Sequence, residues 1–114
     1  MQYTRLGKSD LLVSRICMGC MGFGDPSTGQ HRWTLDADQT RDILEQALRQ
    51  GINFFDTALA YQGGTSEQFV GRALKTLAKR EDVVVATKFL PRTPEQIQAG
   101  VTVSGHIEQM LNQS

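Results

Sequence analysis

Hydrophobic and polar positions follow two different periods along this chain, and these periods predict strands and helices in turn. Strand-like runs occupy residues 3–6, 11–13, 16–18, 52–55 and 83–87. Apolar positions at helical spacing extend over 36–50 and 65–77, and again from Ser104 onward. After an opening hairpin, strands and helices therefore alternate, which predicts parallel pairing through right-handed crossovers. The expected fold class is α/β.

The predicted helix ends carry recognisable signals. Asp36 with Gln39, and Thr65 with Gln68, have the spacing of a capping box, in which each side chain bonds to the other residue's backbone. Gly51 stands where the C-terminal cap of the first helix is expected. These signals place both helices between strands.

The same pattern predicts which side chains are buried. The apolar face of the first helix carries Ile43, Leu44, Ala47 and Leu48. Strand 83–87 is rich in β-branched residues, so both of its faces should be covered. Residues 90–103 read as a polar loop. The last helix should point its apolar positions inward, at Ile107, Met110 and Leu111.

Composition and charge exclude several classes of function. The 114 residues suffice for one domain, and 12 basic residues balance 12 acidic ones. We therefore expect no nucleic-acid partner and no anionic membrane surface. No apolar run is long enough to span a bilayer, and the first ten residues lack the apolar core of a secretory signal. These features predict a cytoplasmic protein.

Two cysteines, Cys17 and Cys20, have the Cys-x-x-Cys spacing of redox pairs and half zinc sites. A redox pair usually opens a helix, whereas a glycine-rich loop follows here. A zinc site needs about four ligands, and His31 and His106 show no matching spacing. We therefore favour small residues packed at a strand end and expect no metal.

Residues 19–35 form a long loop, and long loops inside domains are usually functional. The Gly22-Phe23-Gly24 stretch follows a strand but no helix comes promptly after it, so a dinucleotide-binding fingerprint is not indicated. The aromatic residues of the loop leave two interpretations open. Phe23 and Trp33 either line the mouth of a substrate site or anchor the loop.

Three ionisable side chains follow two neighbouring strands. Asp56 and Tyr61 come after strand 52–55, and Lys88 comes after strand 83–87. The carboxyl ends of parallel strands form one rim, so the three groups should meet there. A carboxylate would keep the lysine charged, and the ammonium would make the phenol a better acid. Such an acid could protonate a carbonyl oxygen while hydride arrives from a nicotinamide.

Each of these residues also has an ordinary structural interpretation. Asp56 could end its strand in an Asx turn, Tyr61 could be a turn aromatic, and Lys88 could be a solvated strand-end residue. Taken singly, these interpretations are favoured. Three such residues on one rim favour catalysis instead.

The motifs GINFFDTALAY and VVVATK, with the turn Gly64-Thr65-Ser66-Glu67 between them, resemble the aldo-keto reductase superfamily. The opening YTRLGKSDLLVSRICMGCMGFG is similar to that family's hairpin and first barrel strand. The resemblance covers nearly the whole chain and is closest to bacterial members related to potassium-channel β-subunits.

This resemblance implies a (β/α)₈ barrel that uses NADPH to reduce aldehydes or ketones. Asp56, Tyr61 and Lys88 match the catalytic positions of the family. The residues implied to bind the cofactor are Gly19, Cys20, Met21 and Asp56. Residues 1–114 would then be an N-terminal hairpin plus the first three β/α units, the N-terminal part of an incomplete barrel domain.

The resemblance also implies that catalytic and cofactor-binding parts lie outside this chain. The family's histidine ends the fourth strand, and His106 does not match it. A barrel of this type needs about 250 residues, so we expect the 114-residue chain alone to be inactive and to bind NADPH poorly. It would be the first part of a reductase, a truncated silent product that self-associates through open sheet edges, or a nucleotide-sensing module.

Overall fold

The computed structural model describes residues 1–114, and it begins with the expected hairpin. Strands β1 (Tyr3–Arg5) and β2 (Leu12–Ser14) pair antiparallel, with Thr4 opposite Val13. The Tyr3 hydroxyl donates a hydrogen bond of 2.7 Å to the carbonyl of Gly51, which ties the hairpin to the end of the first helix.

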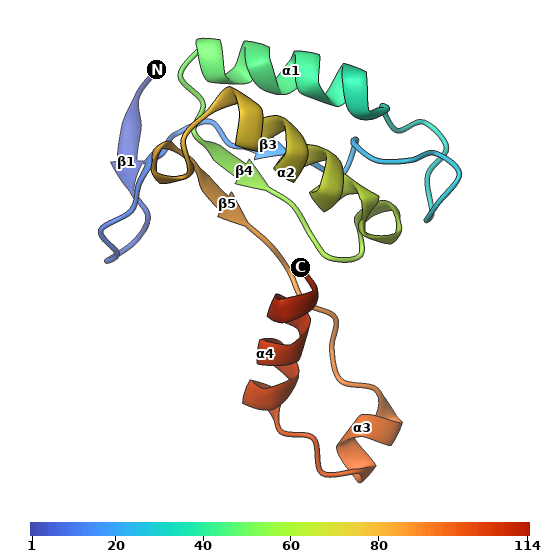
Figure 1. Ribbon diagram of the computed structural model, residues 1–114. Coiled ribbons are helices and arrows are strands. Elements are labelled where there is room, and N and C mark those ends of the chain that lie inside the picture. Colours follow the sequence, from blue (N-terminus) through green and yellow to red (C-terminus); the bar gives the residue numbers. More distant parts are fainter.

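A second sheet of three parallel strands forms the centre of the structure (Figure 1). Its order is β3 (Met18–Gly19), β4 (Phe54–Asp56) and β5 (Val84–Ala86). Parallel pairing is confirmed, and Asp56 lies opposite both Gly19 and Ala86. The strand expected over 16–18 begins only at Met18, because Ile16 and Cys17 lie exposed before the ladder starts.

Helices α1 (Ala37–Arg49) and α2 (Thr65–Leu77) pack side by side on one face of this sheet (Figure 1). Phe55 of β4, Leu44 of α1 and Val70 of α2 are buried in one core beneath the helices. Burial of such side chains drives the assembly of these layers. Ile43, expected on the buried face, is instead 37% exposed at its edge.

The two predicted capping boxes have different outcomes. Asp36 caps α1, and its reciprocal bonds with Gln39 confirm the first box. The second box is wrong, because Gly64 occupies the N-cap position of α2. The Thr65 hydroxyl donates instead to the carbonyl of Gln62 and accepts from the amide of Asp25. A loop contact has replaced the local cap.

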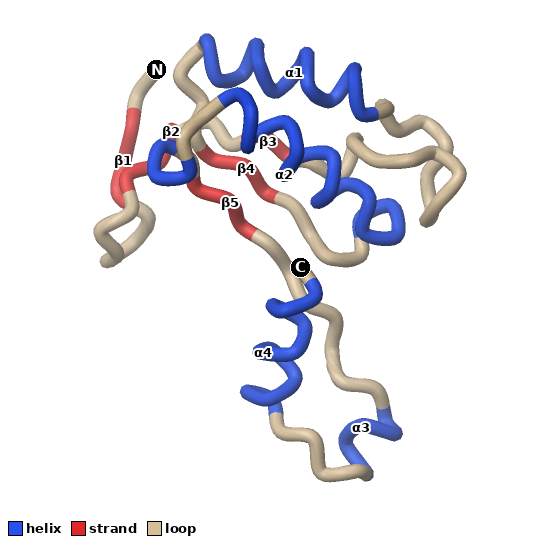
Figure 2. Tube along the Cα trace, in the orientation of Figure 1, coloured by secondary structure: helices blue, strands red, loops and turns tan.

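The C-terminal part of the chain extends away from the sheet as α3 (Pro94–Gln98) and α4 (Val103–Gln113) (Figure 2). The loop predicted over 90–103 therefore contains a helix. Its start has a capping box formed by Thr93 and Gln96, with Pro94 in the first turn. Proline is well tolerated there because its missing N–H would be unpaired anyway.

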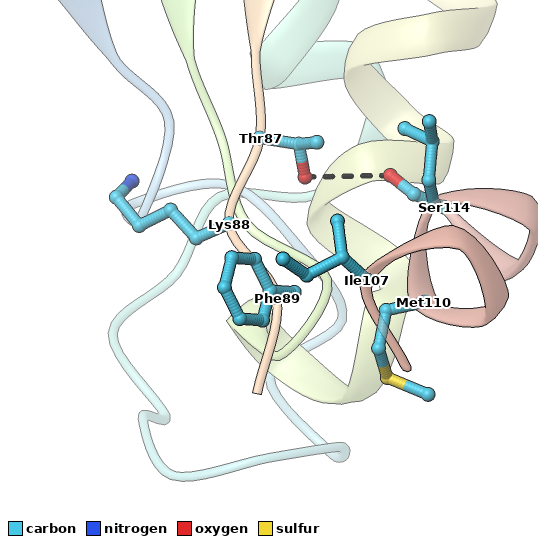
Figure 3. A pocket seen from close by; sticks show the side chains of 7 residues that line it. Thr87, Lys88, Phe89, Ile107, Met110 and Ser114 are labelled. Carbon is cyan, nitrogen blue, oxygen red and sulfur yellow. Dashed lines mark hydrogen bonds between the residues drawn. The ribbon is translucent and has the colours of Figure 1, made fainter. Parts of the chain in front are cut away.

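The apolar side of α4 does not face a packed core. Ile107, Met110 and Phe89 border an open hollow of about 200 Å³ (Figure 3). Leu111 lines the same hollow and is 61% exposed. The inward packing predicted for these positions is therefore wrong in this structure. The prediction that both faces of β5 are covered is wrong as well, since Val85 is 38% exposed beside α2. None of the helices combines the length and apolarity needed to cross a membrane.

Candidate active site

The three predicted ionisable residues meet at the carboxyl ends of β4 and β5. Asp56 is the last residue of β4, Lys88 follows β5 by two positions, and Tyr61 begins a short 3₁₀ helix over Tyr61–Gly64. The Lys88 Nζ atom lies 2.9 Å from Asp56 Oδ1 and 3.1 Å from the Tyr61 hydroxyl oxygen. The structure thus confirms that the three side chains converge.

The backbone explains why Lys88 can reach both partners. Asp56 and Ala86 are paired in register, so the segments that follow them leave the sheet next to each other. The amide of Thr57 then donates to Ala86, and that of Leu59 donates to the carbonyl of Lys88. These bonds hold the two segments side by side beyond the last ladder pair.

Lys88 uses all its donor capacity at this rim. Its ammonium donates to Asp56, to Tyr61 and, at 2.9 Å, to the main-chain carbonyl of Thr57. An ammonium group has three N–H donors, so each has a partner. The same nitrogen lies 4.9 Å from the centroid of the Tyr61 ring. The Thr57 carbonyl could not be predicted from the sequence, because every residue has a main-chain carbonyl.

Two opposing influences act on the pKa of Lys88. Burial lowers it, while the hydrogen bonds to Asp56 and Tyr61 and the charge of Asp56 raise it by more, so the pKa lies above its ordinary value. The ammonium is therefore charged at neutral pH. The ion pair is open to solvent, with side chains 48% and 41% exposed, so it contributes little to folding. The pair also keeps the ammonium within hydrogen-bond distance of the Tyr61 hydroxyl.

The residues implied to touch a cofactor surround the end of β3. Gly19 is exposed opposite Asp56, and no atom lies within 4 Å of the position that a Cβ there would take. Met21 is also exposed, whereas the Cys20 side chain is fully buried in the core. Only the backbone of Cys20 is near the rim, since its amide donates to the Asp56 carbonyl at 2.9 Å. A cofactor role for these residues stays a prediction.

Both thiols are free, and neither is activated. Burial raises the pKa of each, that of Cys20 to about 12. A nucleophilic or redox-active cysteine needs the opposite shift, because the thiolate is the reactive form. Their environment therefore fits packing at the strand end better than redox chemistry.

The two aromatic residues of the long loop have different environments. Phe23 is buried in the core and its backbone bridges to Leu35, so it anchors the loop. Trp33 is exposed, and its ring centroid lies 4.7 Å from that of His31. A hollow of about 170 Å³ lies next to this pair, between the loop and the Tyr61 segment, and is lined by Met21, Gln30, His31, Ala60, Tyr61 and Gln62.

Comparisons with known proteins agree with this geometry. Residues 15–114 match the model of the Aldo/keto reductase family. Versiconal hemiacetal acetate reductase of Aspergillus parasiticus is 43% identical over 89 residues, which cover 77% of this chain and 25% of that protein. A probable voltage-gated potassium channel subunit beta of Arabidopsis thaliana is 38% identical over 90 residues, with 77% and 25% covered. The chain spans about a quarter of the length of these curated relatives.

Solved structures show the same relationship. The aldo-keto reductase AKR11C1 from Bacillus halodurans, in its holo form, matches with a TM-score of 0.73 and 32% identity over 99% of this chain and 35% of its own. The thermostable aldo-keto reductase Tm1743 matches with a TM-score of 0.69 and 25% identity, covering 99% and 38%. The expected fold class, part of a (β/α)₈ barrel, is confirmed. By sequence and by fold, the chain belongs to the aldo/keto reductase family of oxidoreductases.

Proposed function

We propose that Asp56, Tyr61 and Lys88 serve the NADPH-dependent reduction of aldehydes or ketones to alcohols in a complete barrel. The observation that carries this proposal is the set of bonds from one ammonium to the Asp56 carboxylate and the Tyr61 hydroxyl. A phenol held against a lysine that is charged at neutral pH, at the binding rim of a parallel sheet, is suited to donate a proton.

Tyr61 is the general acid in this proposal. Its hydroxyl donates a proton to the carbonyl oxygen of the substrate, and the new O–H bond completes the alcohol. The Lys88 ammonium lies 3.1 Å from the Tyr61 hydroxyl oxygen and stabilises the phenolate that remains. Asp56 holds Lys88 charged and in position through the 2.9 Å ion pair. Stabilising a charge that develops during the reaction is what lowers the barrier.

The residues at the end of β3 fit the nicotinamide end of such a cofactor. Gly19 leaves open space above the backbone, beside Asp56 and within the same rim as Lys88. When bound, the reduced nicotinamide supplies a hydride to the carbonyl carbon. Gly19, Cys20 and Asp56 would hold it mainly through backbone atoms and the Asp56 carboxylate, with Met21 packing alongside.

The test is Tyr61→Phe in the complete barrel protein, measured as NADPH oxidation with a panel of aldehydes and as NADPH binding by fluorescence. We expect reduction to be lost and NADPH binding to be kept. The matched control is Tyr3→Phe, which removes the chain's other phenol from its bond to Gly51. Unchanged turnover in Tyr61→Phe would remove this residue from the mechanism.

A second candidate is a nucleotide-sensing subunit without turnover. It is favoured by the 38% identity to a probable potassium channel subunit beta. NADPH binding by a wild-type barrel that reduces no carbonyl compound would support this alternative. The inactivity of the 114-residue chain alone and its cytoplasmic location remain predictions.

A further inference from the structure

Gln62, the residue after Tyr61, has an unusual backbone conformation. Its φ of 48° makes it the chain's one non-glycine residue with a positive φ, and it is only 3% exposed. A left-handed backbone disfavours residues with a Cβ, and burial of an amide is costly unless it is hydrogen-bonded. Other contacts must therefore stabilise this residue in its position.

The Gln62 side chain supplies such contacts by bonding to the backbone of the long loop. Its Nε2 atom lies 2.9 Å from the Asp25 carbonyl, 2.5 Å from that of Thr28 and 2.7 Å from that of His31. Its Oε1 atom accepts a 3.0 Å bond from the amide of His31. One buried side chain thus holds a whole loop turn, residues 25–31, which we call the Gln62-bound turn.

Two glycines let this turn close tightly around Gln62. A Cβ added to Gly29 would lie 2.6 Å from Gln62 Cα, and one added to Gly24 would lie 2.6 Å from Gln62 Cβ. Real Cβ atoms essentially never come so near, and both glycines also have positive φ. The close fit therefore depends on glycine at both positions.

The Gln62-bound turn forms one wall of the hollow beside the proposed acid. Gln30 and His31 belong to this wall, and Ala60, Tyr61 and Gln62 also line the hollow. Met21 adds a thioether, and such sulfur atoms make favourable contacts with aromatic rings. The hollow of about 170 Å³ therefore combines apolar surface with an amide and an imidazole, and it is lined in part by Tyr61, the proposed acid.

We propose that Gln62 is a positioning residue that holds the His31 wall beside Tyr61, so that the hollow keeps the shape needed for a bulky substituent, such as a ring, of the carbonyl substrate. This inference rests on the proposed carbonyl reduction and adds a residue that positions one wall of that site. Gln62 acts through the loop backbone, so its effect falls on binding of the ring. Proton transfer by Tyr61 itself should change little.

The experiment measures steady-state kinetics of the complete barrel protein with benzaldehyde and with propanal, which has no ring. In Gln62→Ala we expect KM for benzaldehyde to rise at least tenfold. KM for propanal, kcat for both aldehydes and the Kd for NADPH should change less than threefold. Gly29→Ala should repeat this pattern, whereas the control Gly71→Ala, whose Cβ would meet nothing within 4 Å, should not.

Gln62→Glu keeps the shape of the side chain and replaces the amide donors by a carboxylate that faces three carbonyl oxygens. The KM for benzaldehyde should rise here too, and should fall again as the pH is lowered, because a protonated carboxyl regains one donor. Hydrogen exchange in the 114-residue chain should show faster exchange over residues 25–34 in each Gln62 variant. The emission of Trp33, the chain's single tryptophan, reports the same loop.

The outcomes separate this inference from the function on which it rests. A wild-type barrel that reduces neither aldehyde overturns the proposed function and this inference with it. An active wild type whose benzaldehyde KM is unchanged in Gln62→Ala, Gln62→Glu and Gly29→Ala overturns this inference alone. A fall in kcat for both aldehydes at constant KM also overturns it, because Gln62 would then act through Tyr61.

Discussion

The ammonium of Lys88 lies 2.9 Å from the carboxylate of Asp56, although 32 positions of the sequence separate them. The parallel register of β4 and β5 produces this proximity, because Asp56 is paired with Ala86, two residues before Lys88. The third partner, Tyr61, reaches the same nitrogen from the turn after β4. The proposed proton donor and its charged partners thus come from two adjacent strand ends.

Replacement of Lys88 by methionine should separate activity from stability. In the complete barrel protein, Lys88→Met should lower the rate of carbonyl reduction by at least about 100-fold, as for loss of general acid catalysis. The free energy of unfolding should change by less than about 1 kcal/mol, because the ion pair is solvent-exposed. NADPH oxidation and urea denaturation measure the two effects.

The control for this substitution is Lys79→Met, at an exposed lysine with no side-chain bond. It should leave both quantities nearly unchanged. A large loss of stability in Lys88→Met, with activity kept, would show that Lys88 is a structural residue only.

Above neutral pH, the Asp56–Lys88 interaction should weaken only when Lys88 loses its proton. The pKa of Lys88 is raised in the folded state, so its contribution is complete below the ordinary value of 10.5 and is lost as the pH rises through the higher folded value. A double-mutant cycle with Asp56→Asn and Lys88→Met, measured by denaturation, should therefore give a constant coupling from about pH 6 to about pH 9. A coupling that already declines near neutral pH would contradict this assignment.

The two cysteines should differ in reactivity despite their short spacing. Cys17 is exposed and Cys20 is buried, and burial raises the pKa of both. Iodoacetamide at about pH 8 should modify Cys17 more slowly than a free thiol of ordinary pKa near 8.5, and should modify Cys20 only after unfolding. Mass spectrometry of native and denatured samples checks this. Fast alkylation of native Cys20, or a disulfide between the two, would restore the redox interpretation.

Self-association of the 114-residue chain through its sheet edges is a further prediction. Strands β3 and β5 each pair only with β4, and Val85 of β5 exposes apolar surface. A lysine on an edge strand opposes pairing with another chain. Val85→Lys should therefore lower the dimer fraction in sedimentation, while Ile43→Lys, at a position of nearly equal exposure on α1, should not. A concentration-independent monomer for the wild-type chain would contradict the prediction.

Features that depend on neighbours in sequence could be read before the structure was known. The hairpin, the strand–helix alternation and the Asp36 cap of α1 all follow from local spacing. The prediction of the second cap was wrong because Thr65 bonds instead to Gln62 and to Asp25, which belongs to the distant loop. The prediction that the apolar side of α4 is buried was wrong for a related reason. A helical pattern predicts an apolar side but not which surface will lie against it.

The candidate site likewise has a part that could be predicted from the sequence and a part that could not. Asp56, Tyr61 and Lys88 were predictable because each lies at or just beyond the end of a strand, and parallel strands bring their carboxyl ends to one rim. The Thr57 carbonyl and the Gln62-bound turn were not, since both depend on main-chain atoms brought together over 31 to 37 positions. The sequence by itself determined the fold class and the three side chains at the rim. Only the tertiary structure decided how the long loop closes beside Tyr61, because backbone carbonyls bind without regard to the residue that carries them.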